Sequence, residues 1–302
     1  MIEVLDAGRW TTVQDRGRPG RERFGIPAGG AADWFAAAVA NRIVGNLQDA
    51  ALLECTAAGP TLRFDADAVV ALTGGHSTGA ANWQPLRIAR GASLTVGTIA
   101  PGLRSYIAVR GGIDVPLVLG SRSFCQRGTF GGGFGRPLQR GDRLAVGRLG
   151  EYEPLAAPWP ESHRLPARGP WEVHVIPGPQ LDAFAEDALQ RLTTTACRVT
   201  PAIDRMGLRL ATPGLRLQPQ EIVTVPMTAG AIQVTPSGGL IVLHVDHQST
   251  GGYPVIATVI SADLPLLAQA RPGDTVRFRS VDQAEAARAH RRLTGWLDRQ
   301  SS

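Results

Sequence analysis

The chain has 302 residues, of which 43% are hydrophobic and 19% charged, and its net charge is +5. This size and composition are typical of one large or two smaller globular domains, and no apolar run reaches the ~18 residues of a membrane span. The opening residues, MIEVLDAGRW, lack the features of a secretory signal. We therefore expect a cytoplasmic protein that does not contact a membrane. Its three scattered cysteines exclude a disulfide framework.

All 31 basic residues are arginine. The absence of lysine excludes covalently attached biotin or lipoate, a lysine Schiff base and the lysine of a phosphate-binding GxxxxGK[ST] loop. The arginines are scattered, and their main cluster, near the C-terminus, has no interleaved aromatic residues and no nucleic-acid motif. We therefore expect no nucleic-acid partner.

Short apolar runs between glycine and proline turns predict many strands. In the first half these are Ile2–Leu5, Thr11–Gln14, Leu52–Cys55, Ala68–Thr73, Ser93–Val96, Arg104–Arg110 and Arg143–Val146. In the second half they are Glu172–Ile176, Thr194–Val199, Glu221–Val225, Ala231–Thr235, Leu240–His244, Val255–Ile260 and Thr275–Arg279. Many short strands with such turns are typical of a β-barrel or sandwich.

Apolar periodicity predicts three helices among these strands. They are Asp33–Gly45, which has a glycine at its end, Gln180–Leu192, and Asp282–Arg299. In the last helix, Asp282 and Glu285 have the spacing of a capping box, and a narrow apolar stripe indicates that it lies on the surface of a barrel.

The segment Glu153–Pro170 holds five prolines and no periodicity, which is typical of a linker. Glycine-aspartate turns that lead into strands recur near the end of each half, in LQRGDRLAVG and ARPGDTVRF. We therefore predict a mainly β protein with a few helices and two related β-barrel domains, over 1–153 and 171–302, joined by a linker over 154–170.

The first candidate site lies between residues 11 and 54, where carboxylates and amides gather beside glycine turns. Gln14 and Asp15 end a predicted strand, and Asp33 and Asn41 lie on the first helix. Loops with fixed polar residues often carry function. We expect Asp15 to orient an amide N–H as a catalytic residue, and Gln14, Asp33 and Asn41 to bind substrate. Asp33 has an alternative role as the cap of the helix.

The second candidate site is a glycine-rich loop of four residues, Gly131, Gly132, Gly133 and Gly135, followed by Arg136. Backbone N–H groups in such a loop can approach an anion, and Arg136 can bind a carboxylate or phosphate through two parallel hydrogen bonds. Arg110 is a further candidate for substrate binding. The loop does not match a dinucleotide fingerprint, and a flexible turn is the alternative.

The third candidate site is the turn DHQSTGGYP, residues 246–254. Asp246, His247 and Gln248 are its catalytic candidates, because histidine exchanges protons near neutral pH and the others can orient a substrate. Thr250 and Tyr253 are its substrate-binding candidates. His244, Asp246 and His247 lack the fourth ligand of a metal site, so we predict no metal. The chain has no Gly-x-Ser-x-Gly nucleophile either.

Taken together in order, these motifs resemble the biotin-dependent carboxyltransferase family, which includes the C subunit of 5-oxoprolinase and allophanate hydrolase subunit 2. The resemblance is carried by TTVQDRGRPG, GIPAGGAADWFAAAVANRIVGN, GPTLRF, AVRGGIDVPLVLGSRS, GGFGRPLQRGD, VHVIPGPQ, DRMGLRL, GAIQVTPSGG, TGGYPVIATVI and DLPLLAQARPGD. The fold it implies is two cyclophilin-like β-barrel subdomains.

The resemblance implies three settings for the chain. The first is membership of an ATP-dependent complex that hydrolyses L-5-oxoproline to L-glutamate, with an A-type hydrolase as a further component. The second is the carboxyltransferase part of a biotin-dependent urea or amide carboxylase that forms allophanate. The third is a regulatory module without turnover that binds a kinase inhibitor. In each, the partner is a B-type protein similar to allophanate hydrolase subunit 1. No cofactor is bound covalently, and ATP or carboxybiotin comes through partner subunits.

The chain departs from the family at one motif. Members commonly carry TGGYPKI, whereas this chain has Val255 in place of the lysine. If that lysine assists carboxyl transfer or binds an anion, the chain is impaired or retuned, which keeps the regulatory setting open. The absence of lysine throughout the chain offers a simpler explanation of Val255, namely a sequence background that favours arginine.

Overall fold

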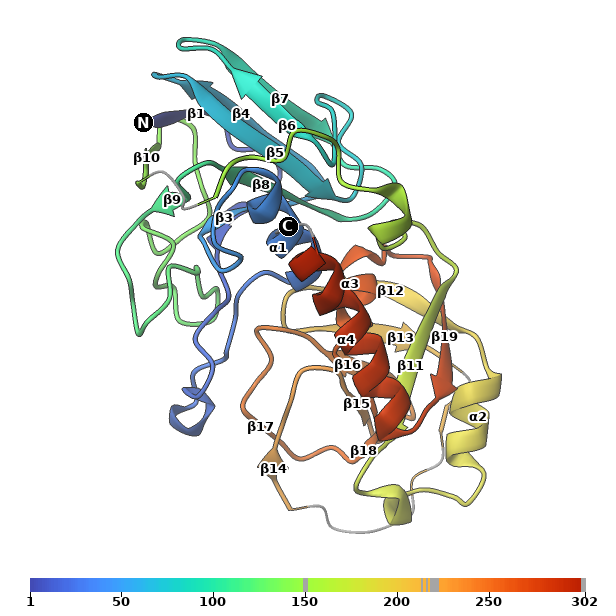
Figure 1. Ribbon diagram of the computed structural model, residues 1–302. Coiled ribbons are helices and arrows are strands. Elements are labelled where there is room, and N and C mark those ends of the chain that lie inside the picture. The colour runs from blue at the N-terminus through green and yellow to red at the C-terminus, as the bar shows by residue number, and fades with distance from the viewer. Residues whose placement is uncertain (149–151, 213, 216, 218–222, 300–302) are drawn as a thin grey trace. The chain divides into compact units, whose positions relative to one another are not determined.

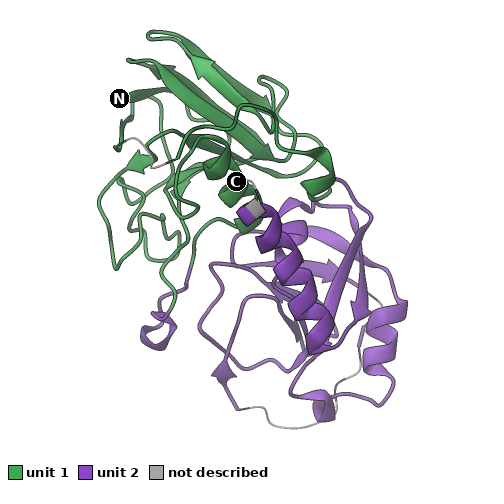
Figure 2. Cartoon of the chain, in the orientation of Figure 1, with its two compact units in different colours: residues 1–19, 29–167, 299–302 green, residues 20–28, 168–298 purple. Residues whose placement is uncertain are grey.

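The computed structural model describes residues 1–148, 152–212, 214–215, 217 and 223–299. The chain divides into two compact units, shown in Figure 2. Unit 1 comprises residues 1–19, 29–167 and 299–302, and unit 2 comprises residues 20–28 and 168–298. No helix in the described residues is both long and apolar enough to cross a membrane.

Unit 1 contains two five-stranded sheets (Figure 1). The first has the order β7-β4-β1-β10-β9, formed by Ser93–Thr98, Ala58–Phe64, Ile2–Asp6, Arg143–Val146 and Ile113–Asp114. The second has the order β2-β3-β8-β5-β6, formed by Thr11–Gln14, Leu52–Thr56, Arg104–Val109, Ala68–Gly74 and Pro85–Ile88. All of their strand pairings are antiparallel.

Helix α1 (Trp34–Ile43) packs on β5 and β8 of the second sheet. Every residue of β8 is buried, as expected for a strand covered on both faces. The Asp33 side chain caps the helix by accepting from Ala36 N (2.8 Å), and Gly45 follows its end with a φ of 76°. A glycine accepts that left-handed conformation without strain. The predicted helix Asp33–Gly45 is thus this helix together with its caps.

Unit 2 is built on a closed barrel of seven strands in the order β11-β18-β15-β16-β13-β12-β19. These strands are Trp171–Pro177, Val255–Val259, Ala231–Val234, Leu240–Leu243, Gly207–Ala211, Cys197–Ile203 and Thr275–Ser280. The first and last, β11 and β19, pair in parallel and close the barrel. A separate two-stranded sheet joins β14 (Val225–Pro226) to β17 (Thr250–Gly251).

The helices of unit 2 are α2 (Ala188–Thr194), α3 (Leu264–Gln269) and α4 (Gln283–Arg299), in the described residues. The predicted capping box at the start of α4 is present, since Asp282 Oδ1 accepts from Glu285 N (2.7 Å) and Glu285 Oε2 accepts from Asp282 N (3.2 Å). Short 3-10 turns cover Glu22–Phe24, Glu161–His163 and Leu181–Ala183. The predicted fold class, mainly β with barrel subdomains, is confirmed.

Two predicted elements around residue 190 are wrong. In place of a helix over Gln180–Leu192, a 3-10 turn is followed by Phe184, and α2 begins only at Ala188. Phe184 has an extended backbone, is buried and forms a β-bridge with Leu217. Burying Phe184 outweighs the helical periodicity. The predicted strand Thr194–Val199 begins later, at Cys197. The predicted strand Glu221–Val225 falls partly outside the described residues, and β14 begins at its end.

The proline-rich segment around Trp159 packs within unit 1. Trp159 is fully buried, its N–H donates to Trp83 O (2.7 Å), and its indole donates to His163 O (3.0 Å). Arg164 donates in turn to Trp159 O (2.7 Å). These contacts anchor the segment to the first unit and place the division of the chain at residues 167 and 168.

A buried polar group joins α1 to the second sheet of unit 1. The Tyr106 hydroxyl donates to Glu54 Oε2 (2.9 Å) and accepts from Asp33 N (2.7 Å). Glu54 Oε2 also accepts from Ala32 N (2.8 Å), and Arg104 lies 3.8 Å from its other oxygen. Burial, with the charge of Glu54, raises the pKa of Tyr106 well above its usual value, so the phenol stays a donor.

We predict that Tyr106→Phe lowers the free energy of unfolding by about 1–3 kcal/mol, because a buried N–H and a buried carboxylate each lose a partner. Urea unfolding measures the effect. The matched control is Tyr152→Phe at an exposed tyrosine, which we expect to change stability by less than about 0.5 kcal/mol. Equal effects at the two positions would contradict this account.

Candidate functional site

The predicted site residues fall into two groups, one in each unit. In unit 1 the centre is Asp15, which follows β2. Its carboxylate accepts four hydrogen bonds, from Ser121 Oγ (2.6 Å), Ser123 Oγ (2.5 Å), Arg122 N (2.6 Å) and Gly17 N (2.7 Å). With donors on both of its oxygens, this carboxylate is held in one orientation. Asp15 therefore organises the loop around residues 121–123, and its carboxylate oxygens accept hydrogen bonds from that loop.

The glycine-rich loop packs on the segment that Asp15 organises. Gly132 N donates to Arg122 O (3.0 Å), and Arg18 donates to Ser123 O (2.5 Å) while its guanidinium lies 5.0 Å from the Phe130 ring centre. This brings Asp15 and the glycine-rich loop, two of the sequence-predicted features, into one substructure.

Close packing explains the glycines of this loop. Gly131, Gly132, Gly133 and Gly135 all have positive φ, from 63° to 80°. A Cβ on Gly131 would lie 2.2 Å from Ser123 O, and one on Gly133 would lie 2.7 Å from the Val115 side chain. Since Gly132 N donates to Arg122 O and Gly135 N donates to Gly131 O, these glycines serve the packing of the chain itself. Their role in binding an anion stays a prediction.

Three other predicted residues of unit 1 have internal partners. Gln14 is fully buried, and its Nε2 donates to Thr12 Oγ1 (3.0 Å) and Phe124 O (3.3 Å). Asn41 donates to Ala50 O (2.8 Å), and Asp33 caps α1 as described. These contacts support structural roles, and substrate binding by these three side chains stays a prediction.

Arg136 and Arg110 are both paired with carboxylates. Arg136 donates to the two oxygens of Asp142 at 2.7 Å each, which closes the turn before β10. Arg110 donates to Glu153 at 3.1 and 3.3 Å, and Glu153 is exposed. The Arg110 pair is the easier one for an incoming anion to displace, because exposed ion pairs contribute little stability.

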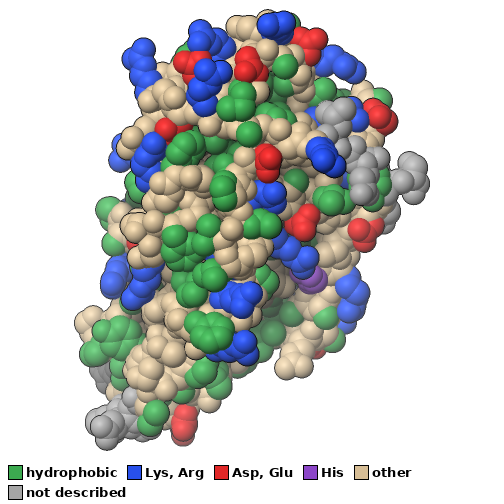
Figure 3. Space-filling view, turned by 90° about the vertical axis from the view of Figure 1, so that its left-hand side faces the viewer, with side chains coloured by type: hydrophobic (Ala, Val, Ile, Leu, Met, Phe, Trp, Pro, Cys, Tyr) green, Lys and Arg blue, Asp and Glu red, His purple; other side chains and the backbone are tan. Residues whose placement is uncertain are grey.

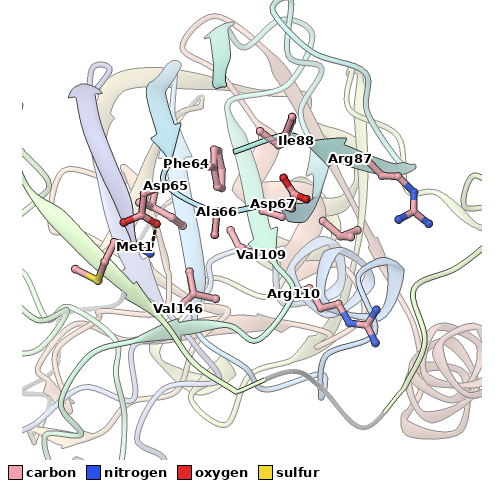
Figure 4. Close-up of a pocket in the computed structure, with 14 residues that line it drawn as sticks. Met1, Phe64, Asp65, Ala66, Asp67, Arg87, Ile88, Val109, Arg110 and Val146 are labelled. Atoms are coloured by element: carbon pink, nitrogen blue, oxygen red, sulfur yellow. Dashed lines mark hydrogen bonds and ion pairs between the residues drawn. The ribbon is translucent and has the colours of Figure 1, made fainter. Parts of the chain in front are cut away.

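Arg110 also lines a groove of about 540 Å³ in unit 1 (Figure 4). Phe64, Ile88 and Val109 supply apolar walls, and Asp65 lies at one side, 2.5 Å from the Met1 ammonium group. Of the predicted site residues, which all lie in the described part of the chain, Arg110 alone lines this groove. The basic side chains are spread among acidic and apolar ones on the face drawn in Figure 3.

In unit 2 the turn after β16 is clamped by a buried ion pair. Arg205 donates to both oxygens of Asp246, at 2.8 and 3.1 Å, and both side chains are at least 95% buried. Two backbone hydrogen bonds add to this pair: Asp246 N donates to Arg205 O (2.8 Å), and His244 N donates to Met206 O (2.9 Å). Asp246 thus holds the turn in place, and its assignment as a catalytic residue stays a prediction.

His247 and Gln248 follow on this turn. The Nδ1 of His247 lies 2.7 Å from Gln248 O. Because a carbonyl only accepts, Nδ1 carries the proton and Nε2 of the neutral ring is left as an acceptor. The Nε2 of Gln248 donates to Gln233 Oε1 (3.3 Å), a buried carboxamide on β15.

Of the last two predicted residues, Thr250 lies on strand β17 and Tyr253 follows two residues after the end of that strand. Thr250 is exposed and pairs with Pro226 across the two-stranded sheet, and Tyr253 is 42% exposed. The backbone N–H of Val255, at the position of the family lysine, donates to Gln180 Oε1 (2.9 Å). Gln248, Gln233 and the exposed Thr250 and Tyr253 therefore form the candidate site of unit 2.

The sequence reasoning missed Ser121, Ser123, Arg205, Gln233 and Gln180. Gln233 had a visible signal, since it is a lone amide within the apolar run of GAIQV. Ser121 and Ser123 alternate beside Gly120, but nothing in the sequence pairs them with a residue more than 100 positions away. All three cysteines are buried, and burial raises the pKa of the Cys55 thiol to about 12 and that of the Cys197 thiol above its usual value, so these two are not activated as nucleophiles.

Asp142 makes stability depend on pH. Its hydrogen bonds from Arg136 hold its pKa below the usual value, so its contribution is full above about pH 4 and is lost as the pH falls through the lower, folded pKa. We predict that Asp142→Asn costs about 1–2 kcal/mol at neutral pH and progressively less below pH 4. Urea unfolding at several pH values measures this, with exposed Asp49→Asn as the control. A cost that does not change with pH would contradict it.

We predict that Asp246→Asn lowers the free energy of unfolding by about 3–5 kcal/mol, because it removes the carboxylate charge to which Arg205 makes two buried hydrogen bonds. The double change Arg205→Met with Asp246→Leu removes both charges and should cost less than the single change. Thermal or urea unfolding distinguishes these outcomes. A single variant as stable as the parent would show that the pair does not hold the turn.

Comparison with known proteins places the chain in a family. The profile of the carboxyltransferase domain, subdomains A and B, matches residues 24–280. The chain is 36% identical over 302 residues to the C subunit of 5-oxoprolinase from Escherichia coli, and the match covers 96% of this chain and 94% of that protein. It is 34% identical over 307 residues to the C subunit of 5-oxoprolinase from Haemophilus influenzae, with 99% and 97% covered.

Among solved structures, the urea carboxylase of Kluyveromyces lactis is similar, with a TM-score of 0.93 and 32% identity. The match covers 99% of this chain and 29% of that chain. The match of the profile to most of the chain and the identity to the two bacterial subunits agree with the motifs. The chain therefore belongs to the carboxyltransferase family that contains subdomains A and B.

Proposed function

We propose that this chain is the C-type subunit of an ATP-dependent 5-oxoprolinase complex that hydrolyses L-5-oxoproline to L-glutamate. One observation carries the proposal: the two bacterial relatives that are named as C subunits of 5-oxoprolinase match over 97% and 94% of their own lengths. In this proposal the chain acts with a B-type protein and an A-type hydrolase, and ATP binds through these partners.

The residues of unit 2 suit the recognition of an amide. A lactam is stable, and ATP bound to a partner supplies the energy that activates it. Gln248, Thr250 and Tyr253 provide neutral donors and acceptors on one turn, where they can orient the amide and stabilise the charge that develops on it. The buried cysteines supply no nucleophile. These features favour a component that binds and orients the substrate.

A second candidate function is carboxyl transfer to urea or a related amide. The TM-score of 0.93 to a urea carboxylase favours it. A chain without lysine cannot carry biotin, so its residues fit the side that receives the carboxyl group, and carboxybiotin would come from a partner. The same carboxamides and hydroxyls would then hold the accepting amide.

Reconstitution with the A-type and B-type partners tests the proposal. We expect L-glutamate to form from L-5-oxoproline together with ATP hydrolysis, and both to stop when this chain is left out. Mixtures with urea and a biotin carboxylase form the second arm.

Glutamate formation that persists without this chain would overturn the proposal. Turnover in the urea arm alone would favour carboxyl transfer. Tight binding to the B-type partner, measured by calorimetry, with no turnover in either arm would favour the regulatory module that Val255 keeps open.

A further inference from the structure

Gln233 is a carboxamide inside an otherwise apolar strand. Strand β15 reads Ala-Ile-Gln-Val, and all four residues are buried, with Gln233 only 1% exposed. Its neighbours Met227 and Val255 belong to a small apolar cluster. A buried amide is unfavourable unless it is hydrogen-bonded, so a valine would suit packing alone better than this glutamine.

The backbone is shaped around this side chain. Ile232 pairs with Ala257 but Gln233 pairs with Val255, so β18 contains one extra residue at this point. Such a bulge re-aims neighbouring side chains and is common beside active sites. A Cβ on Gly251 would lie 2.6 Å from Gln233 Nε2, so β17 passes close to the carboxamide at this glycine.

The hydrogen bonds of Gln233 lead to the candidate site. Its Nε2 donates to Tyr253 O (3.4 Å) and towards the Met227 sulfur (3.5 Å), and its Oε1 accepts from Gln248 Nε2 (3.3 Å). All three contacts are long for their type. Packing therefore holds the Gln233 side chain in place, and its hydrogen bonds restrict the positions of the Gln248 side chain and of the backbone at Tyr253.

The contact with Gln233 leaves one edge of the Gln248 carboxamide available. One N–H of Gln248 Nε2 donates to Gln233, while the second N–H and Oε1 have no partner among the residues that the structure describes. Where Gln233 takes the N–H that lies trans to Oε1, the remaining N–H and Oε1 form a donor and an acceptor side by side. A cis amide, as in a lactam or urea, presents the complementary N–H and C=O, and the two groups can form a pair of hydrogen bonds.

We propose that Gln233 is a positioning residue, which fixes the rotation of the Gln248 carboxamide so that its free edge reads the cis amide of the substrate. The terminal torsion of a glutamine is otherwise broad, so an unsupported Gln248 would present this edge only part of the time. The inference rests on the proposed function for its substrate, and on the contacts within unit 2 for its geometry.

A double-mutant cycle in the reconstituted complex tests it. Gln233→Met keeps the length and the apolar surroundings but removes the acceptor for Gln248. We expect it to raise KM for L-5-oxoproline about tenfold and to leave kcat within about twofold. In a Gln248→Met background the same change should alter KM less than twofold, because the two residues act as one unit. Gln190→Met, an exposed glutamine on α2, is the matched control.

Equal effects of Gln233→Met in both backgrounds, or an unchanged KM, would overturn the inference. If Gln233→Met does not fold, Gln233→Glu takes its place, since it keeps an acceptor and should hold KM within about threefold of the parent. A tenfold rise for Gln233→Glu would also overturn it.

A readout in the isolated full-length chain separates this inference from the proposed function. Hydrogen exchange of the Gln248 side-chain amide, followed by NMR, should be faster in Gln233→Met than in the parent. If the parent complex turns over neither substrate, the proposed function fails, and this exchange still decides the inference. Unchanged exchange would overturn it.

Discussion

The buried ion pair between Arg205 and Asp246 fixes the turn on which the unit 2 site is built. Because the two side chains form two hydrogen bonds away from water, the turn after β16 has little freedom to move relative to β13. Gln248 lies two residues further along and inherits this rigidity. A carboxamide recognises a substrate well only when both the backbone that carries it and its own side-chain torsion are fixed. The ion pair serves the first need, and the contact with Gln233 serves the second.

The same division of labour holds in unit 1, where charged side chains build structure. Asp15 gathers two serine hydroxyls and two backbone N–H groups, and Arg136 closes a turn with Asp142. Charged groups are costly to leave unpaired inside a protein, so the chain surrounds them with partners. Neutral amides and hydroxyls are cheaper to leave partly unpaired. They are therefore the groups that remain available for a ligand at Gln248, Thr250 and Tyr253.

The sequence predicted the fold class and most strands well, because apolar runs, glycine turns and the capping box at Asp282 act locally. It failed near Phe184, where burial of one ring overrides helical periodicity. It also missed the strands β4, β6 and β13 and the short helix α3. The site was harder. Asp15 and Asp246 are conspicuous carboxylates in the sequence, but their partners Ser121, Ser123 and Arg205 are distant. Only the fold shows that these carboxylates are used internally.

The closure of the unit 2 barrel has a consequence for the order of folding. Strands β11 and β19 lie about 100 residues apart in the chain and pair in parallel, so the ring is complete only when the last strand is in place. Until then β11 and β12 each have an open edge, and the sheet that carries Gln233 is not closed. During synthesis the chain must therefore protect these edges for the time that the ribosome needs to add the remaining strands. Closure of the barrel that carries Gln233 is consequently a late event, coupled to the arrival of Thr275–Ser280.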